Sequence, residues 1–516
     1  MEATRRSRRS FLRGAAIGAG VAAASGALPV AAQESVEEDG VQADVVVVGG
    51  GLAGLTAALR AAEDGATVVV LEKQAWPPVS NSTLCFGSCY CFDSQLQRDE
   101  GIAASVEDHY ADMRKYMPWG DPDLQRAWVE NIGPAVDFLM EHGVNVVPYE
   151  YPFDRWGVRI PPADFYAAVV PALEELGVQI IASTRAQRLL TNEDGEVIGV
   201  RAKGEDGKCF DVKANRGVVL AGGGFQLNNE LVTRYIAHDA TRATRLQRWG
   251  YGGTGDSLLM ALEAGAKTSM DMDTWYGHLV FLTEDGERPE GFRMTSGGSL
   301  KFDVLCAVVN IYGKRFTDES SSSEMIAQDA LKQPESVLPP YGRAFVILDD
   351  TIYQNRKGEF EAAAKQGAVM ASAETLEELG ELVKAWGVDG DQMVATIQEF
   401  NQAIEEGREA ELVPPKTVMQ EGGYVYTLPL LNKIETPPFY AVPTKPAITF
   451  TEGGIGIEPG GAVLDRDGNP IPRLFAAGDA VGGAASRQYV AGTGVGKAIA
   501  QGFVAGAAAA ATEPLA

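Results

Sequence analysis

The stretch ADVVVVGGGLAG, residues 43–54, decides the fold class. Its first half is an apolar run of the kind that forms a strand buried on both faces of a parallel sheet. The run ends at glycines that fit G-x-G-x-x-G, and a helical stretch over residues 55–64 follows. A second apolar run, residues 67–71, ends at Glu72. Strand, glycine loop, helix and strand in this order predict a βαβ unit that binds a dinucleotide.

The residue types of this unit suit a pyrophosphate and a ribose. Glycines let backbone N–H groups approach the phosphates, and the N-terminus of a helix offers them partial positive charge. A carboxylate at the end of the second strand accepts hydrogen bonds from ribose hydroxyls. An ordinary tight turn is the alternative explanation for the glycines. We assign to the cofactor Gly49, Gly51, Leu52, Ala53, Gly54, Glu72 and Lys73.

Two later strand-like runs also end at glycines, over residues 216–225 and 473–479. The second ends in Asp479, whose carboxylate could bind a sugar hydroxyl. The sequence GTGVGK, residues 492–497, then opens an alanine-rich helix that extends to about residue 511. The dipole of that helix would stabilise negative charge on a neighbouring group.

Composition and charge narrow the function classes. A chain of 516 residues needs more than one domain, and 45% hydrophobic with 22% charged residues is typical of a globular protein. Lys and Arg number 44 against 70 Asp and Glu, a net charge of −26. This charge argues against a nucleic-acid partner and against an anionic lipid surface.

The first residues are typical of an export signal. The segment RRSRRSFLR, residues 5–13, precedes a weakly apolar Gly/Ala stretch that ends at Ala32. We predict a twin-arginine signal peptide over residues 1–32, an acidic linker over 33–42, and a periplasmic or cell-envelope location. A membrane anchor is the alternative, but the glycines make the run a poor spanning helix. We expect no integral membrane span in the mature chain.

Five cysteines are scattered through the chain, which excludes a disulfide framework. Three of them cluster, but their spacing fits no familiar zinc or iron–sulfur pattern and no histidine lies near them. We expect small buried side chains rather than metal ligands, and no metal. No C-x-x-C-H motif is present to attach a c-type haem. The five are Cys85, Cys89, Cys91, Cys209 and Cys306.

Five motifs in order resemble the FAD-dependent fumarate reductase and 3-ketosteroid dehydrogenase family. They are the 49–54 loop with Glu72, residues 220–225, residues 255–257 with 264–266, the segment GKRFTDES over 313–320, and Gly478-Asp479. The resemblance spans about residues 43–510, nearly the whole mature chain.

The resemblance implies an α/β fold in which both ends of the chain form a Rossmann-like FAD-binding domain, residues 43–274 and 448–516. An inserted α+β capping domain, residues 275–447, would close over the substrate. No histidine occurs in residues 81–84, where membrane-bound members attach FAD covalently, so we expect non-covalent FAD. Further implied cofactor-binding residues are Ala221, Gly222, Gly223, Asp256, Gly478, Asp479, Gly494 and Val495.

Members of this family transfer a hydride between the flavin and a carbon, while a side chain moves the neighbouring proton. At three positions where fumarate reductases hold cationic or histidine side chains for a dicarboxylate, this chain has Ser323, Tyr489 and Phe450. A dianionic substrate would lose charge-assisted hydrogen bonds there, at a cost of several kcal/mol. The resemblance therefore implies a neutral or apolar substrate, such as a ketosteroid or another enone.

Tyr489 matches a loop in which ketosteroid dehydrogenases polarise the substrate carbonyl, although their second catalytic tyrosine is replaced here by Ser323. A buried core tyrosine and a structural His278 are the alternatives for two of the candidates, and residues 320–324 could be a polar loop beside the cofactor. Candidate catalytic residues are Tyr489, Ser323, Glu324 and His278. Candidate substrate-binding residues are Trp275, Tyr276, Phe450 and Gly492.

The predicted function is an FAD-dependent oxidoreductase that acts on a small molecule at a C–C bond conjugated to a carbonyl. No second nucleotide loop for NAD(P)H is evident, so electrons would pass through a quinone or an exported electron-carrier protein. An enoate reductase fed by a separate cytochrome and a flavin-binding protein without turnover are the alternatives.

Overall fold

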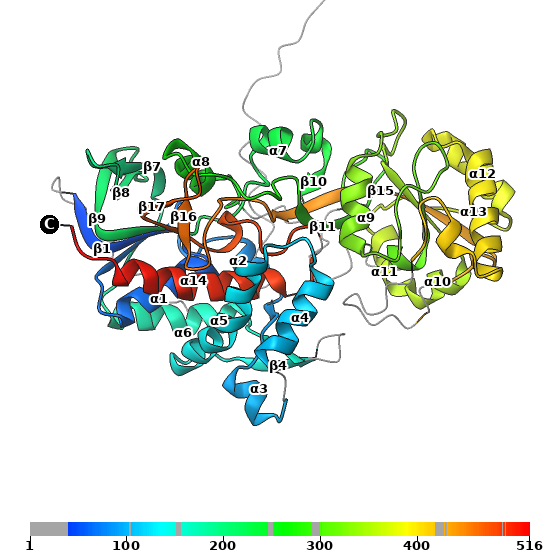
Figure 1. Cartoon of the computed structure of the whole chain (residues 1–516). Coiled ribbons are helices and arrows are strands. Elements are labelled where there is room, and N and C mark those ends of the chain that lie inside the picture. The colour runs from blue at the N-terminus through cyan, green and yellow to red at the C-terminus, as the bar shows by residue number, and fades with distance from the viewer. Residues whose placement is uncertain are drawn as a thin grey trace, which may run out of the picture. The chain divides into compact units, whose positions relative to one another are not determined.

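The computed structural model describes residues 40–102, 105–150, 156–245, 251–289, 300, 302–417, 428, 431–487, 489–490 and 492–515. The predicted signal peptide and most of the acidic linker lie outside these residues. Within them, three β-sheets carry the fold (Figure 1).

The largest sheet has the order β16-β17-β9-β1-β2-β6, and the antiparallel pair β7–β8 continues from β9. Neighbours from β17 to β6 run parallel. The expected strands at 43–48, 67–71, 216–220 and 473–476 are all present. The members are β1 Val41–Val48, β2 Val68–Leu71, β6 Gln179–Ile181, β7 Arg185–Thr191, β8 Val197–Lys203, β9 Cys209–Leu220, β16 Ala462–Leu464 and β17 Pro470–Ala476.

Helices from the two ends of the chain pack together beside this sheet (Figure 1, blue and red). They are α1, Leu52–Glu63, and α14, Thr493–Ala511. The sequence predicted both helices, with the start of α1 placed three residues later, at residue 55. A Cβ on Gly502 would lie 2.4 Å from the Ala53 carbonyl oxygen, and one on Gly506 would lie 2.3 Å from that of Ala57. The glycines of α14 therefore allow an approach that no larger residue permits.

The remaining helices of this part are α2 Asn81–Leu84, α3 Gln95–Asp99, α4 Val106–Tyr116, α5 Pro122–Glu141, α6 Pro162–Glu175, α7 Asn229–Tyr235 and α8 Asp256–Glu263. A small antiparallel sheet has the order β3-β5-β4, with β3 Ser88–Cys89, β4 Val147–Glu150 and β5 Trp156–Arg159. No described helix combines the length and the hydropathy needed to cross a bilayer.

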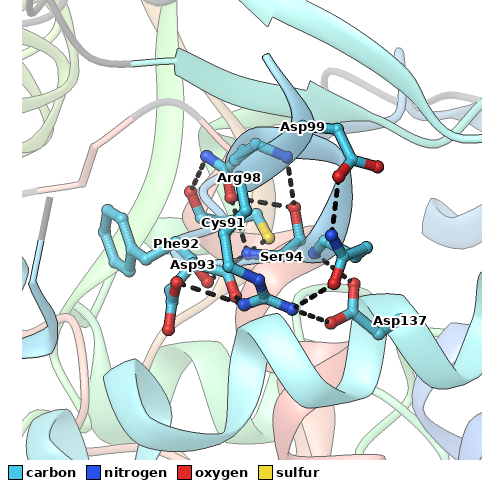
Figure 2. A network of polar contacts seen from close by, with 9 residues as sticks. Cys91, Phe92, Asp93, Ser94, Arg98, Asp99 and Asp137 are labelled. Atoms are coloured by element: carbon cyan, nitrogen blue, oxygen red, sulfur yellow. Dashed lines mark hydrogen bonds and ion pairs between the residues drawn. The ribbon is translucent and has the colours of Figure 1, made fainter. Parts of the chain in front are cut away.

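A polar network fixes the segment after the cysteine cluster (Figure 2). Ser94 and Gln97 form a capping box at the start of α3, and Arg98 reaches Asp137 on α5 at 3.0 Å. The Gln97 amide donates to the Cys91 carbonyl at 2.9 Å. All five cysteines are free thiols, and burial raises the pKa of Cys89.

The second large sheet is built around β15, the long orange strand in Figure 1. Its order is β10-β15-β13-β12, and β11 and β14 also pair with β15. Its strands are β10 Thr244–Arg245, β11 Trp275–Phe281, β12 Ala307–Val309, β13 Ala344–Leu348, β14 Ala371–Ala373 and β15 Phe439–Thr451. The helices of this region are α9 Ser323–Leu331, α10 Asp350–Asn355, α11 Lys357–Ala364, α12 Leu376–Val383 and α13 Gly390–Glu405.

Between residues 331 and 438 the chain contributes the strands β13 and β14 besides its helices. Helix α13 begins at Gly390, because the Asp389 carboxylate caps it by accepting the Gln392 N–H at 3.0 Å. The proposed boundary between residues 447 and 448 lies inside the continuous strand β15. The division into domains remains a proposal.

The segment GKRFTDES, residues 313–320, has a structural role. The Arg315 guanidinium holds the Glu319 carboxylate through two hydrogen bonds, of 2.9 and 2.6 Å, and both side chains are buried. Glu319 also accepts the N–H of Val308 on β12 at 3.0 Å. This pair fixes the chain just before α9, the helix that begins with Ser323 and Glu324.

Replacing Arg315 by methionine should cost about 3–5 kcal/mol of stability, because it leaves the Glu319 charge buried without its partner. The double variant R315M/E319L should recover much of that loss. Urea unfolding measures both, with Arg201→Met as the control, since Arg201 forms a half-exposed pair with Asp211 and should change stability by less than about 1 kcal/mol. Equal losses in the single and double variants would contradict this role of the pair.

Candidate active site

The glycine loop after β1 is shaped by close backbone contacts. Gly49 has a φ of 113°, and a Cβ there would lie 2.4 Å from the Ala221 carbonyl oxygen. A Cβ on Gly54 would lie 1.9 Å from the carbonyl oxygen of Gly49. Only glycine fits either position, and the result is a tight turn that leads directly into the N-terminus of α1.

Glu72 is buried at the end of β2 and braces this loop. One carboxylate oxygen accepts the Gly50 N–H at 2.8 Å, and the other accepts the Gln74 N–H at 2.9 Å. The first turn of α1 has a second polar neighbour, because the Leu52 N–H donates to the Ser82 hydroxyl at 3.0 Å. Glu72 therefore has a structural role besides the ribose contact that we predict for it.

Lys73 and Asp256, which we assigned to the cofactor, bind each other. The Lys73 ammonium lies 3.0 Å from Asp256 and 2.7 Å from the Gly252 carbonyl, and Arg185 contacts the other Asp256 oxygen at 2.7 Å. Burial alone would raise the pKa of Asp256, but the Arg185 hydrogen bond and the Lys73 charge lower it below its usual value. In this arrangement the two residues hold the 252–256 turn, and their contact with the cofactor stays a prediction.

The carboxyl ends of β1, β9 and β17 meet at one edge of the parallel sheet. The Gly222 N–H donates to the Ser257 hydroxyl at 3.1 Å, and Gly223 has a φ of 79° with open space beside it. A Cβ on Gly478 would lie 2.8 Å from the Ala53 side chain. Asp479 follows, with Asn81 at 3.5 Å as its hydrogen-bond donor, and burial raises the pKa of its carboxyl group against the charge of Lys497.

These features fit FAD. The tight 49–54 turn allows a pyrophosphate to approach the backbone and the α1 N-terminus closely, and Glu72 and Asp479 are carboxylates for the sugar and ribitol hydroxyls. Gly494 and Val495 lie in the first turn of α14, whose dipole suits a reduced, negatively charged flavin. Helix α2 brings residues 81–84 beside this site.

Three aromatic side chains, here called the aromatic cluster, lie together next to α14. They are Tyr276 on β11, Phe450 on β15 and Tyr489. The rings of Tyr276 and Phe450 stack with centroids 4.9 Å apart, and the Tyr489 ring lies 4.1 Å from that of Tyr276. The Tyr489 hydroxyl accepts the Gly494 N–H at 3.2 Å. Burial raises the pKa of the Tyr489 phenol, which therefore stays protonated at neutral pH.

The other two predicted substrate-binding residues have different surroundings. Trp275 is almost fully buried, and its carbonyl accepts from the Gln328 amide at 2.9 Å, so its side chain is part of the core. Gly492 is the N-cap of α14 with a φ of 89°, and its carbonyl accepts the Tyr90 N–H at 3.1 Å. Gly492 thus sets the entry of the chain into α14.

His278 and Ser323 lie in contact behind the aromatic cluster. The His278 Nε2 lies 3.0 Å from the Tyr276 hydroxyl, and its Nδ1 lies 3.3 Å from the Ser323 hydroxyl. The Ser323 hydroxyl also lies 3.1 Å from a carboxylate oxygen of Asp303. Glu324 is buried with its carboxylate 4.0 Å from His278 Nδ1. All four predicted catalytic residues thus lie in or beside one cluster.

Sequence reasoning missed two buried acids. The Asp303 carboxylate contacts the Ser323 hydroxyl on the side away from His278. The two residues are distant in sequence, and only folding makes them neighbours. Glu452 lies at the end of β15, buried, with no hydrogen-bond partner for either oxygen among the described residues. Burial raises its pKa well above the usual range, against the charge of Lys497. The sequence did contain a signal for Glu452, because this acid interrupts an otherwise uncharged run over residues 446–457.

The fold and site together define an FAD-dependent oxidoreductase. Residues 44–495 match the FAD binding domain family, so the chain belongs to that family. A urocanate reductase from Eggerthella lenta is 29% identical over 85% of this chain and 70% of its own length. A vinyl phenol reductase from Lactiplantibacillus plantarum is 29% identical over 85% of this chain and 90% of its own length.

Among solved structures, a 3-ketosteroid-Δ4-(5α)-dehydrogenase from Rhodococcus jostii RHA1, in complex with 4-androstene-3,17-dione, is 26% identical with a TM-score of 0.68. The match covers 93% of this chain and 99% of that one. Some relatives are longer, since the chain spans only 44% and 47% of two further reductases. These similarities agree with the family resemblance and with the α/β FAD-binding fold that the sequence predicted.

Replacing Gly54 by alanine should abolish most FAD binding, because the added Cβ would lie 1.9 Å from the Gly49 carbonyl oxygen and deform the loop. The ratio of flavin to protein absorbance in the purified protein measures this. Gly358→Ala is the matched control, since a Cβ there meets nothing within 4 Å. A G54A protein with full FAD content would contradict the role of the loop.

Glu452→Gln should stabilise the protein more at high pH than at low pH. Because burial raises the pKa of Glu452 above its usual 4.5, the folded state holds a proton that the unfolded state loses, and stability falls as the pH rises above 4.5. The glutamine variant lacks this loss. Thermal unfolding at about pH 5 and about pH 8 should show a gain in melting temperature that is larger at the higher pH. A pH-independent difference would contradict a buried, proton-holding Glu452.

Proposed function

We propose that the protein adds or removes hydrogen across a C–C bond conjugated to a carbonyl, in a neutral or largely apolar substrate such as a ketosteroid or another enone. The observation that carries this proposal is the aromatic cluster beside the Gly494 N–H. Three aromatic rings packed together offer apolar contacts to a flat substrate bound beside them, and none of the three side chains carries a permanent charge that would hold a carboxylate.

Tyr489 and Gly494 are the groups that bind the substrate carbonyl. The Gly494 N–H lies in the first turn of α14 and points at the Tyr489 hydroxyl oxygen. A substrate oxygen that displaces the Tyr489 hydroxyl from the Gly494 N–H would accept both this N–H and the phenol O–H, with the helix dipole adding to both. Because burial keeps Tyr489 protonated, it acts as a donor. Polarising the carbonyl favours hydride addition at the β-carbon and acidifies the C–H beside the carbonyl.

FAD, held by the glycine loop, Glu72 and Asp479, supplies the hydride chemistry when bound. We propose that it is bound non-covalently, since α2 offers Asn81, Ser82, Thr83 and Leu84 and no histidine for attachment. Acid precipitation should then release the flavin into the supernatant.

Names among the relatives include enzymes of neutral compounds and enzymes of carboxylates such as urocanate, fumarate and acrylate, so they do not select the substrate class. They include a vinyl phenol reductase and a ketosteroid dehydrogenase, beside a urocanate reductase. Electron exchange with a quinone or a carrier protein, and export through a twin-arginine signal over residues 1–32, complete the proposal. A quinone or carrier protein is proposed in place of NAD(P)H, because no second nucleotide-binding loop is evident in the sequence. The location is supported by the arginine-rich start of the chain.

Anaerobic flavin spectroscopy tests the substrate class. A neutral enone should reoxidise the dithionite-reduced protein, or a saturated 3-ketosteroid should bleach the oxidised protein. Tyr489→Phe should slow either reaction by about 100-fold, since it removes one donor to the developing oxyanion. Tyr312→Phe is the control, because that tyrosine is exposed.

Three results would contradict the proposal. Reoxidation by fumarate or cinnamate alone would mean an enoate reductase with an anion site elsewhere. A fully FAD-loaded protein that reacts with none of these compounds would mean a flavin-binding protein without this turnover. An unchanged rate in Tyr489→Phe would remove the tyrosine from the carbonyl site.

A further inference from the structure

Four buried side chains form a continuous line of hydrogen-bonding groups, here called the polar chain. It runs from Asp303 through Ser323 and His278 to Tyr276. The three steps are 3.1 Å between Asp303 Oδ2 and Ser323 Oγ, 3.3 Å between Ser323 Oγ and His278 Nδ1, and 3.0 Å between His278 Nε2 and Tyr276 Oη. None of the four side chains is more than 7% exposed.

We propose that Tyr276 exchanges a proton with the substrate carbon beside the carbonyl, and that His278, Ser323 and Asp303 relay that proton. This inference rests on the proposed function and deepens it, because it supplies the acid and base that the reaction needs. Tyr276 is the catalytic residue of the proposal, and the other three act through it.

The two tyrosines of the cluster have different partners, which separates their roles. Tyr489 faces the Gly494 N–H, a group that can bind only an oxygen or another acceptor. Tyr276 instead lies at one end of the polar chain, whose side chains can exchange protons with one another. Their ring centroids are 4.1 Å apart, so both can face one substrate, with Tyr489 at the carbonyl oxygen and Tyr276 at the neighbouring carbon.

The proton inventory balances in the direction of reduction. The Tyr276 O–H bond breaks as a C–H bond forms on the substrate, and His278 Nε2–H then restores the tyrosine. His278 Nδ1 takes the Ser323 hydroxyl proton, and the Asp303 carboxyl restores the serine. The substrate gains this proton and a hydride from reduced FAD, Asp303 becomes a carboxylate, and solvent returns its proton before the next turnover. Oxidation of a substrate runs the same steps backwards.

The surroundings of Asp303 suit a stored proton. Its side chain is fully buried, and its Oδ1 has no hydrogen-bond partner among the described residues. Burial raises the pKa of this carboxyl group well above its usual range, and the nearby Glu324 charge raises it further. The Leu300 carbonyl, 3.1 Å from Ser323 Oγ, is the other acceptor for the serine proton, so the hydroxyl turns towards His278 during transfer.

Other ionisable groups face the polar chain and enter its pH dependence. Glu324 lies 4.0 Å from His278 Nδ1 and is the second acid beside the histidine. Glu452 and Tyr489 lie beyond the Tyr276 end, and the charge of Glu452 acts on Tyr489. For protons to move from Asp303 towards Tyr276, His278 must be neutral and carry its proton on Nε2.

The resting state of the relay can be tested without turnover. The chain has only four histidines, so ¹⁵N-histidine NMR of the FAD-loaded protein can be assigned with His278→Gln. We expect His278 neutral with its proton on Nε2 near pH 7, and we expect Ser323→Ala and Tyr276→Phe each to move its signals. A doubly protonated His278, or a proton on Nδ1, would overturn the relay.

Substrate proton transfer gives the second readout. Tyr276→Phe should slow reoxidation of the reduced protein by a neutral enone about 100-fold or more, and should abolish deuterium exchange at the α-carbon of a saturated ketone in D₂O by the oxidised protein. Asp303→Asn should slow turnover less and displace its pH profile. Tyr440→Phe is the matched control, because Tyr440 on β15 is as deeply buried as Tyr276 and its hydroxyl also has a polar partner, the Asp350 carboxylate at 3.1 Å.

The outcomes separate the two proposals. A parent protein that reacts with no carbonyl compound overturns the proposed function, whereas the NMR result still decides the state of the polar chain. A parent that turns over while Tyr276→Phe keeps its exchange and its rate overturns the relay and leaves the function standing.

Discussion

The close packing of α14 against α1 is the constraint on which the site depends. Gly502 and Gly506 let the two helices approach until a Cβ would touch the Ala53 and Ala57 carbonyl oxygens. That contact brings the C-terminal end of the chain to the edge of a sheet whose first strand is β1. Gly478 consequently lies against Ala53 of the 49–54 loop and Asp479 follows it, although more than four hundred residues separate them from that loop in sequence. Larger side chains on α14 would move the carbonyl-binding groups away from the cofactor site.

Local sequence patterns predicted the FAD-binding strands, glycine loops and helices, whereas the polar chain depends on tertiary contacts that no local pattern predicts. The apolar run before Gly49 and the glycines after it specify β1 and the start of α1, because their spacing leaves one strand–loop–helix geometry. Asp303, Ser323 and His278 come from three separate segments, so no spacing in the sequence relates them. Lys73 and Asp256 are a second case in which sequence spacing was not enough. Each was assigned to the cofactor, but in the structure the two side chains form an ion pair with each other.

The electrostatics around the aromatic cluster favour an uncharged ligand. Glu324, Glu452 and Asp303 are all buried near it, and burial or a neighbouring acid raises the pKa of the last two. If any of these three acids ionises, it would repel a substrate carboxylate bound near it. The three side chains of the aromatic cluster include no guanidinium that could offset this repulsion. A neutral carbonyl needs only the two donors that Tyr489 and Gly494 provide.

Equilibrium binding of unreactive ligands to the oxidised protein tests this account most directly. A phenol presents one neutral oxygen on a flat ring, whereas succinate presents two carboxylates, and either would perturb the flavin absorption on binding beside it. The account predicts saturable binding of the phenol that is weakened at least about tenfold in Tyr489→Phe, equal to about 1.4 kcal/mol, and no spectral response to succinate. Saturable binding of succinate without binding of the phenol would contradict the assignment of this site to a neutral carbonyl substrate.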